Sequence, residues 1–133
     1  MAFTVEGTER AGRWLVTVDH ATNRVPADIG GGSLGISDQD MARHIAYDVG
    51  ALGLARALGH LLDSPVIASD FSRLVIDPNR GEDDPTLLMK LYDGSVIPGN
   101  RHADHAELSR RLEAYHRPYH AAYAQLVASE PAI

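Results

Sequence analysis

The sequence predicts an α/β fold, a partial three-layer α/β/α arrangement with a mixed, partly parallel sheet. Short β-branched apolar runs and longer amphipathic stretches follow one another in the order strand, helix, strand, strand, helix, which is typical of α/β layering. The chain has 133 residues, of which 44% are hydrophobic. Residues 1–133 are therefore expected to form a single domain with its own core.

The first strand is expected at residues 14–18, where the run WLVTV suits a buried strand. A helix is then predicted from an N-cap at Ser37 to about residue 62, because Asp38 and Asp40 suit the positive end of a helix dipole. Apolar residues at helical spacing line its face: Met41, Ile45, Val49, Leu52, Leu58, Leu61 and Leu62. The glycines within this helix permit close packing against a sheet.

Two further strands are predicted at residues 65–69 and 73–77. The segment 78–103 holds three prolines and three glycines, and an irregular loop of this length is usually functional.

The last helix is expected to begin at Asp104, with Glu107 as the partner in a capping box. Its apolar face consists of Leu108, Leu112, Tyr115, Tyr119, Tyr123 and Leu126. Pro118 lies within this pattern and predicts a kink or break near residues 115–117.

The composition excludes several classes of function. The formal net charge is −6, so there is no electrostatic case for binding nucleic acid or an anionic membrane. Because the chain has no cysteine, any metal must be held by His, Asp, Glu or water. No signal peptide and no stretch of the roughly 18–20 apolar residues that cross a bilayer is visible. A soluble, cytoplasmic protein is expected.

Two groups of residues suit metal or acid–base chemistry. His20 follows the first strand, at the edge where α/β sheets gather ligands, and is either a metal or acid–base residue or a hydrogen-bonded loop histidine. His44 and Asp48 are four residues apart on the predicted helix and either reach one cation or form an ordinary surface pair.

A third group is basic. Arg73 and Arg80 bracket the predicted strand 73–77, and Asn79 precedes Arg80. The planar fork of arginine matches a carboxylate, and asparagine adds an amide donor. These residues are therefore either substrate ligands, joined by Arg101 from the irregular segment, or solvated side chains at strand ends.

Five segments resemble, in order, the N-formylglutamate amidohydrolase family: DHATNRVP, LGISDQDMARHIAYDVGALGLARAL, SPVIASDFSRLVIDPNR, PTLLMKLYDGSVIPGNR and RPYH. The resemblance spans about residues 13–128 and is specific because several linked motifs carry it. The family looks like a branch of the zinc-carboxypeptidase-like superfamily, which includes aspartoacylases and succinylglutamate desuccinylases. A phosphorylase/hydrolase-like fold is implied.

The resemblance also implies roles for single residues. His20 would be the first zinc ligand, Asn79 and Arg80 would bind the α-carboxylate of the substrate, and Arg73 would be a further substrate-binding residue. The superfamily usually has a Glu three residues after the first His, where this chain has Asn23. Asp48 is expected to replace it as the second metal ligand.

Members of the family are about twice as long, and their second half supplies a further metal ligand and the general base. The chain is therefore expected to correspond to the N-terminal half of the domain and to be inactive alone, with no catalytic base of its own. It ends at Ser129–Ile133, where a later strand of the family should begin.

The implied function is zinc-dependent hydrolysis of an N-acyl amide, converting N-formyl-L-glutamate to formate and L-glutamate, as in histidine degradation. Zn²⁺ is the expected cofactor of the complete domain, which the chain alone either retains or lacks. A small acidic N-acyl amino acid is the expected substrate. An exposed sheet edge is expected to favour a homo-oligomer. Two alternatives stay open: an inactive half-domain that acts as a ligand-binding or assembly module, and an amidohydrolase for another N-acyl amino acid.

Overall fold

The sheet of the protein has three strands. The structure is a computed structural model that describes residues 2–129. Its strands are β1 (Phe3–Glu6), β2 (Val16–Val18) and β3 (Val66–Ser69), in the order β1-β3-β2. β3 pairs antiparallel with β1 and parallel with β2. This confirms the predicted mixed, partly parallel sheet and the strands expected at 14–18 and 65–69, whereas the sequence pattern does not predict β1.

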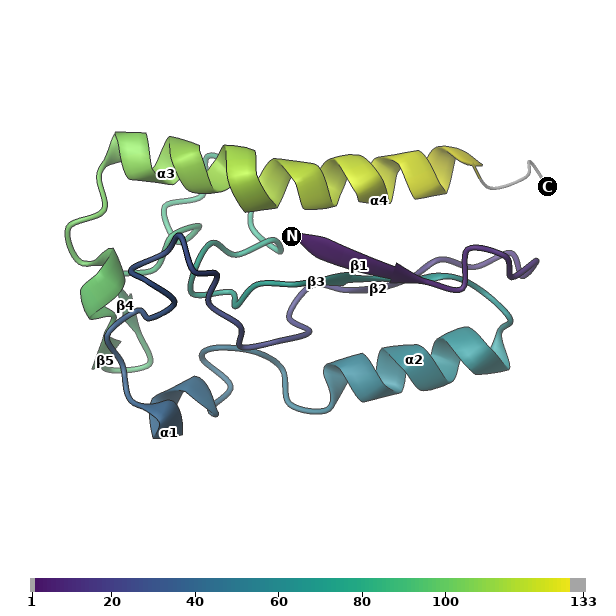
Figure 1. Cartoon of the computed structure of the whole chain (residues 1–133), viewed down its shortest axis with the longest axis horizontal. Helices are drawn as coiled ribbons and strands as arrows, with labels where there is room; N and C mark the ends of the chain where they lie inside the picture. The colour runs from purple at the N-terminus through teal and green to yellow at the C-terminus, as the bar shows by residue number, and fades with distance from the viewer. Residues whose placement is uncertain (1, 130–133) are drawn as a thin grey trace.

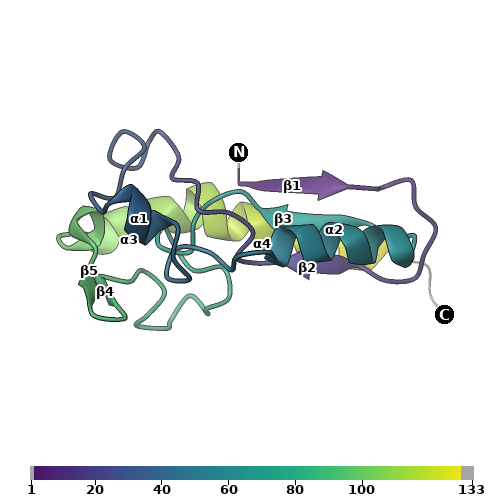
Figure 2. The ribbon, with the colours of Figure 1, turned by 90° about the horizontal axis from the view of Figure 1, so that it is seen from below.

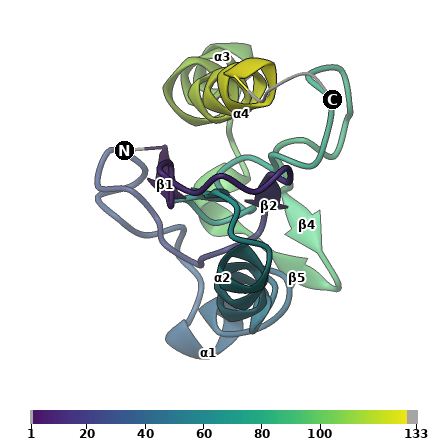
Figure 3. The same ribbon diagram turned by 90° about the vertical axis from the view of Figure 1, so that its right-hand side faces the viewer.

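Helices cover both faces of the sheet, which confirms the three-layer α/β/α arrangement (Figures 1 and 3). α2 (Ala51–Leu61) lies on one face. On the other face, α3 (His105–Arg111), the π-helical turn η2 (Leu112–His116) and α4 (Arg117–Ser129) form one long rod.

The remaining elements lie beyond one end of the sheet (Figure 2). They are α1 (Asp38–Met41), the hairpin strands β4 (Leu91–Tyr92) and β5 (Ser95–Val96), and the 3₁₀ helix η1 (Pro98–Asn100). The hairpin and η1 are the only regular structure described in the segment 78–103, as its prolines and glycines predict. Within residues 2–129, no helix has the length and apolar character that crossing a membrane requires.

The larger part of the core joins the sheet and the α3–α4 rod to buried side chains of the irregular segments. Phe71 is buried with its ring centroid 5.5 Å from that of Tyr115 and 6.4 Å from that of Tyr119. A smaller apolar cluster lies under α2 and consists of Val18, Ala21, Ala55, Val66 and Ala68. The apolar face predicted for the last helix is confirmed at Leu112, Tyr115 and Tyr119, which are buried.

The single helix predicted from Ser37 to residue 62 is wrong, because turns divide it into α1 and α2. Ser37 caps α1, its Oγ accepting a hydrogen bond from the Asp40 N–H at 3.1 Å. α2 begins only after Gly50, whose φ is +83°. This left-handed conformation suits glycine and interrupts the helical register.

The apolar face predicted for this helix is confirmed only in part. Ile45 is buried and Leu52 packs against the smaller apolar cluster, whereas Val49 and Leu61 are 70% and 83% exposed. On α2, Ala55 and Gly59 are buried instead. A Cβ at Gly59 would lie 2.4 Å from Cγ2 of Val66. The close packing predicted from the glycines is confirmed at this position.

Residues 73–77 form a buried irregular segment rather than the predicted strand. Side chains from later in the chain satisfy its carbonyls: Asn100 donates to Leu74 O at 2.7 Å, and Arg111 donates to Val75 O at 2.9 Å. Arg111 also donates to Oδ1 of Asn100 at 2.6 Å. The run is apolar because it is buried, and its hydrogen bonds do not come from a sheet.

The last helix begins as predicted, with the Asp104 side chain accepting a hydrogen bond from the Glu107 N–H at 2.9 Å. The disturbance predicted before Pro118 is the π-helical turn η2, in which the Arg117 N–H donates to Leu112 O. Because proline has no N–H, the wider turn lets the rod continue past it. The strand expected to begin near Ser129–Ile133 falls on residues 130–133, outside the described residues.

Candidate active site

The candidate site begins where β2 ends. Asp19 and His20 follow Val18 directly, and Ser69 at the end of β3 donates its hydroxyl hydrogen to Asp19 O at 2.6 Å. Tyr119 donates its hydroxyl hydrogen to Oδ1 of Asp19 at 2.6 Å. His20 thus lies at the carboxyl end of a parallel strand pair, where α/β sheets bind ligands.

His20 lies between two carboxylates and is only 7% exposed. Its Nε2–H donates to Oδ1 of Asp77 at 2.7 Å, and its Nδ1 faces Oδ2 of Asp48 at 3.2 Å. Burial lowers the pKa of His20, but the hydrogen bond and charge of Asp77 outweigh burial, so this pKa lies above its ordinary value. The buried carboxylate of Asp77 therefore orients the His20 ring, and Nδ1 faces the half-exposed carboxylate of Asp48.

Asp48 reaches His20 because the segment between α1 and α2 folds back over the end of β2. The Asp48 N–H donates to His20 O at 3.0 Å. The pairing of His44 and Asp48 on one helix face is wrong, because residues 44–48 form turns and a bend, and His44 instead lies 3.4 Å from Asp93. Asn23 donates its side-chain amide to Met41 O at 2.9 Å.

Asp77 is the buried centre of the cluster, with a side chain that is 1% exposed. Besides the His20 ring, it accepts hydrogen bonds from Nη2 of Arg73 at 3.0 Å and from the Asn79 N–H at 2.9 Å. Burial raises the pKa of Asp77, but these donors and the His20 hydrogen bond outweigh burial and hold the pKa below its ordinary value. Asp77 is therefore an ionised carboxylate at neutral pH.

Arg73 is almost fully buried beside this centre. Its Nη1 lies 3.8 Å from Oδ1 of Asp48, and its guanidinium carbon lies 5.1 Å from the centroid of the Tyr92 ring. These contacts and the hydrogen bond to Asp77 occupy part of the guanidinium group of Arg73. A role of Arg73 in binding substrate stays a prediction.

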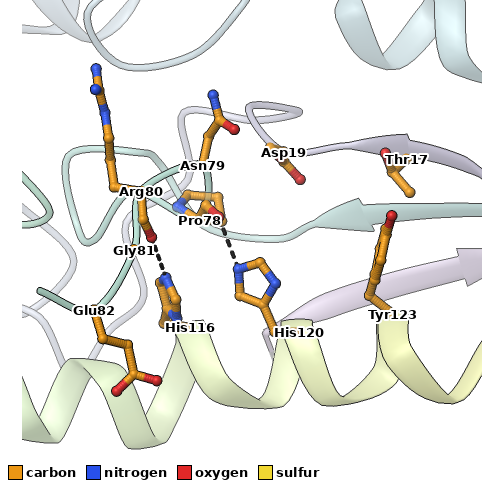
Figure 4. Close-up of a pocket in the computed structure, with 10 residues that line it drawn as sticks. All are labelled: Thr17, Asp19, Pro78, Asn79, Arg80, Gly81, Glu82, His116, His120 and Tyr123. Carbon is orange, nitrogen blue, oxygen red and sulfur yellow. Dashed lines mark hydrogen bonds between the residues drawn. The ribbon is translucent and has the colours of Figure 1, made fainter. Parts of the chain in front are cut away.

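Asn79 and Arg80 present polar ends to open space, whereas Arg101 does not join them. Arg80 is 40% exposed and has a single ionic contact among residues 2–129, with Nε 3.7 Å from Oδ2 of Asp77. Its guanidinium points away from α4 (Figure 4). Arg101 is exposed, and it lines neither of the two cavities that border Asn79.

These two cavities flank β2. One, of about 320 Å³, lies between β2 and α2, and the other, of about 530 Å³, lies between the end of β2 and α4 (Figure 4). Polar residues of the first are Thr17, Asp19, His20, Asp48 and Asn79. Polar residues of the second include Asp19, Asn79, Arg80, His116 and His120. Asn79 therefore connects the His20 cluster with the larger cavity.

Nδ1 of His20 and the carboxylate of Asp48 are the donors available for a metal ion. Imidazole nitrogen with carboxylate oxygen is a donor set that suits Zn²⁺. Within residues 2–129, no group of three or more His, Cys, Asp or Glu side chains is arranged to hold a metal. The described part of the chain thus offers two protein ligands.

The α/β domain thus places a carboxylate-held histidine at a strand end, beside Asn79 and the partly exposed side chain of Arg80. The family model for N-formylglutamate amidohydrolase matches residues 12–132. The chain therefore belongs to the N-formylglutamate amidohydrolase family, a family of hydrolases.

Two solved structures are similar to the chain. One is the gene product Atu2144 from Agrobacterium tumefaciens, at 33% identity and a TM-score of 0.90, covering 96% of this chain and 50% of that one. The other is the N-formylglutamate amidohydrolase from Ralstonia eutropha JMP134, at 26% identity and a TM-score of 0.72, covering 97% and 51%. The chain thus spans about half the length of these relatives. No curated protein matched the chain.

Sequence reasoning found His20 and Asp48. It missed Asp77, the carboxylate that contacts both His20 and the arginines. Asp77 lies within the DPNR motif, and its signal is a carboxylate placed among apolar residues and two arginines. Sequence reasoning also misses His116 and His120, because Pro118 predicts a kink or break beside them. The π-helical turn absorbs that disturbance and leaves both rings on one side of the rod (Figure 4).

Proposed function

We propose that the chain is the metal- and carboxylate-binding half of an amidohydrolase that converts N-formyl-L-glutamate and water to formate and L-glutamate. The observation that carries the proposal is the position of His20, whose Nε2–H is fixed on buried Asp77 while Nδ1 faces Asp48. A carboxylate behind a metal-binding histidine is the usual way in which proteins orient such a ligand. Membership of the family supports the reaction type.

Zn²⁺ is the proposed cofactor, held by Nδ1 of His20 and by Asp48. The donor set fits, since Asp77 keeps the second ring nitrogen occupied and directs Nδ1 toward the carboxylate of Asp48. When bound, the ion supplies Lewis acidity at the scissile amide. A catalytic zinc usually has three protein ligands, so the third ligand and the general base are proposed to come from a part of the domain that these residues do not include.

Asn79 and Arg80 are proposed to bind the α-carboxylate of the substrate. Arg80 is the more accessible of the two arginines next to Asp77. Its planar guanidinium can donate two parallel hydrogen bonds to a carboxylate. Asn79 borders the His20 cavity as well as the larger one. A substrate bound there would have its amide carbon directed toward His20 and Asp48.

Calorimetric titration tests this proposal. Zn²⁺ should bind wild type and His102→Ala, an exposed control, and should bind His20→Ala at least tenfold more weakly. The zinc-loaded chain should then bind N-formyl-L-glutamate. Equal zinc affinity of His20→Ala and wild type would overturn the metal assignment, and tighter binding of N-acetyl-L-glutamate would assign a different acyl group.

A second candidate function is that of an assembly module. Among the described strands, β2 has a neighbour on one side only, and an open strand edge is a template for another strand. Exposed Leu54 and Leu61 lie on the neighbouring helix. This function predicts a dimer by light scattering that Thr17→Pro, which removes an edge N–H, converts to a monomer, together with no zinc by elemental analysis.

A further inference from the structure

Two histidines on the α3–α4 rod contact the loop that carries Asn79 and Arg80. Nε2–H of His120 donates to Pro78 O at 2.9 Å, and Nε2–H of His116 donates to Arg80 O at 2.9 Å (Figure 4). The two ring centroids are 4.6 Å apart. The acceptors are thus the carbonyl before Asn79 and the carbonyl of Arg80.

These bonds fix the backbone on both sides of the proposed carboxylate-binding pair. Pro78 O belongs to the peptide plane that leads into Asn79, and Arg80 O belongs to the plane that leads out of Arg80. The other side of the loop is held by Asp77, which accepts from the Asn79 N–H at 2.9 Å, while its backbone carbonyl accepts from the Arg80 N–H at 3.1 Å. The loop lies in an irregular segment, so no neighbouring strand or helix backbone orients these peptides.

The helical rod places the rings of His116 and His120 next to each other. His116 is the last residue of η2 and His120 lies in the first turn of α4. π-helical turns occur frequently at functional sites. His116 is 95% buried, and its Nδ1 has no hydrogen-bond partner among residues 2–129. Its one polar contact there is the bond to Arg80 O, so the loop accounts for the placement of this ring.

We propose that His116 and His120 are positioning residues that set the orientation of Asn79 and Arg80 for the carboxylate of the substrate. This inference rests on the proposed function and extends it to the helical rod. The histidines do not touch the substrate; they act through the peptide planes that flank the two binding side chains.

Paired substitutions separate this role from a general structural one. Phe keeps the bulk of the ring and removes the donor, whereas Gln places an amide N–H at about the position of Nε2. We expect His120→Phe and His116→Phe to weaken binding of N-formyl-L-glutamate to the zinc-loaded chain about tenfold each, which corresponds to 1.4 kcal/mol. His120→Gln and His116→Gln should restore most of it. His105→Phe, an exposed histidine at the start of α3, is the control.

Two further measurements keep the outcome decisive. Hydrogen exchange of the peptide that contains residues 78–82 should accelerate in the Phe variants and return to the wild-type rate in the Gln variants, whether or not substrate binds. Zinc affinity should stay unchanged in all four. Unchanged exchange and affinity in the Phe variants, no rescue by Gln, or a parallel loss of zinc would each overturn the proposal. If wild type does not bind N-formyl-L-glutamate but exchange responds as expected, the proposed function fails and the positioning of the loop is upheld.

Discussion

Replacing Asp77 by Asn tests the centre of the candidate site. Asp77 is 1% exposed and lies 2.7 Å from Nε2 of His20 and 3.0 Å from Nη2 of Arg73. Asn retains an oxygen for one of these donors, but its amide then faces the other, and the negative charge between them is lost. Removing a carboxylate that orients a metal-binding histidine typically costs about 10- to 100-fold in metal affinity, or about 1.4–2.8 kcal/mol.

The assay is competition for Zn²⁺ against a chromophoric chelator at about pH 8, above the ordinary range of histidine pKa values. This pH matters because Asp77 also raises the pKa of His20, and the zinc must displace the Nδ1 proton. At lower pH, the substitution would ease that displacement and would mask part of the loss. The expected result is a 10- to 100-fold weaker zinc complex.

Asp93→Asn is the matched control. Asp93 is an exposed carboxylate in the turn of the β4–β5 hairpin, and it pairs with Arg43 and His44. This substitution should leave zinc affinity unchanged. Equal zinc affinities for wild type and a folded Asp77→Asn variant would refute the orienting role of Asp77. Equal losses in both variants would show a non-specific effect of net charge.

Three other predictions concern binding and stability. Arg80→Lys should weaken binding of N-formyl-L-glutamate about 10- to 1,000-fold by calorimetry, because a point charge replaces a planar guanidinium. Unchanged binding would show that Arg80 is a solvated side chain that does not bind the substrate. Glu107→Gln should lower the free energy of unfolding by about 1 kcal/mol at neutral pH, after allowance for solvent screening. The hydrogen bond of Arg110 first, and then the hydrogen bond of Arg111 and the charges of both arginines, outweigh burial and lower the pKa of Glu107 from 4.5 to about 2. The difference in urea denaturation should therefore be complete above pH 4.5 and disappear as pH falls toward 2. Gly59→Ala should destabilise the fold by about 1–3 kcal/mol in the same assay, because the new Cβ meets Val66; an unchanged midpoint would show that α2 can move away at no cost.

The elements that the sequence predicts well are those that local signals determine. β2 and β3 are β-branched apolar runs, and the last helix begins at the predicted N-cap Asp104, whose side chain accepts from the Glu107 N–H at 2.9 Å. The Glu107 carboxylate accepts from Arg110 and Arg111 instead of completing the predicted capping box. The resemblance to the family implies His20 as a metal ligand, and Asp48 is expected beside it because Asn23 stands where the family has a Glu. The structure brings Nδ1 of His20 and Oδ2 of Asp48 to 3.2 Å. Their role as metal ligands stays a prediction.

The elements that the sequence predicts poorly depend on distant partners or on one backbone conformation. Residues 73–77 read as a strand because they are apolar, but Asn100 and Arg111 supply the hydrogen bonds that a neighbouring strand would have made. Periodicity alone does not reveal where backbone bonds go. The long helix ends after Met41, and α2 begins only after Gly50, whose left-handed conformation sets a new helical phase.

The buried carboxylate of Asp77 shows how the two parts of the proposed chemistry are held in register. Oδ1 accepts from His20 and from the Asn79 N–H, whereas Oδ2 accepts from Arg73 and lies 3.7 Å from Nε of Arg80. Burying a charge is costly unless several donors compensate, and a buried ion pair adds little net stability. The arrangement is therefore better explained by geometry than by stability: one carboxylate fixes the metal-binding histidine and the carboxylate-binding loop relative to each other. Asp77→Asn and His20→Ala should accordingly be non-additive in zinc binding, because the orientation of the His20 ring depends on Oδ1 of Asp77.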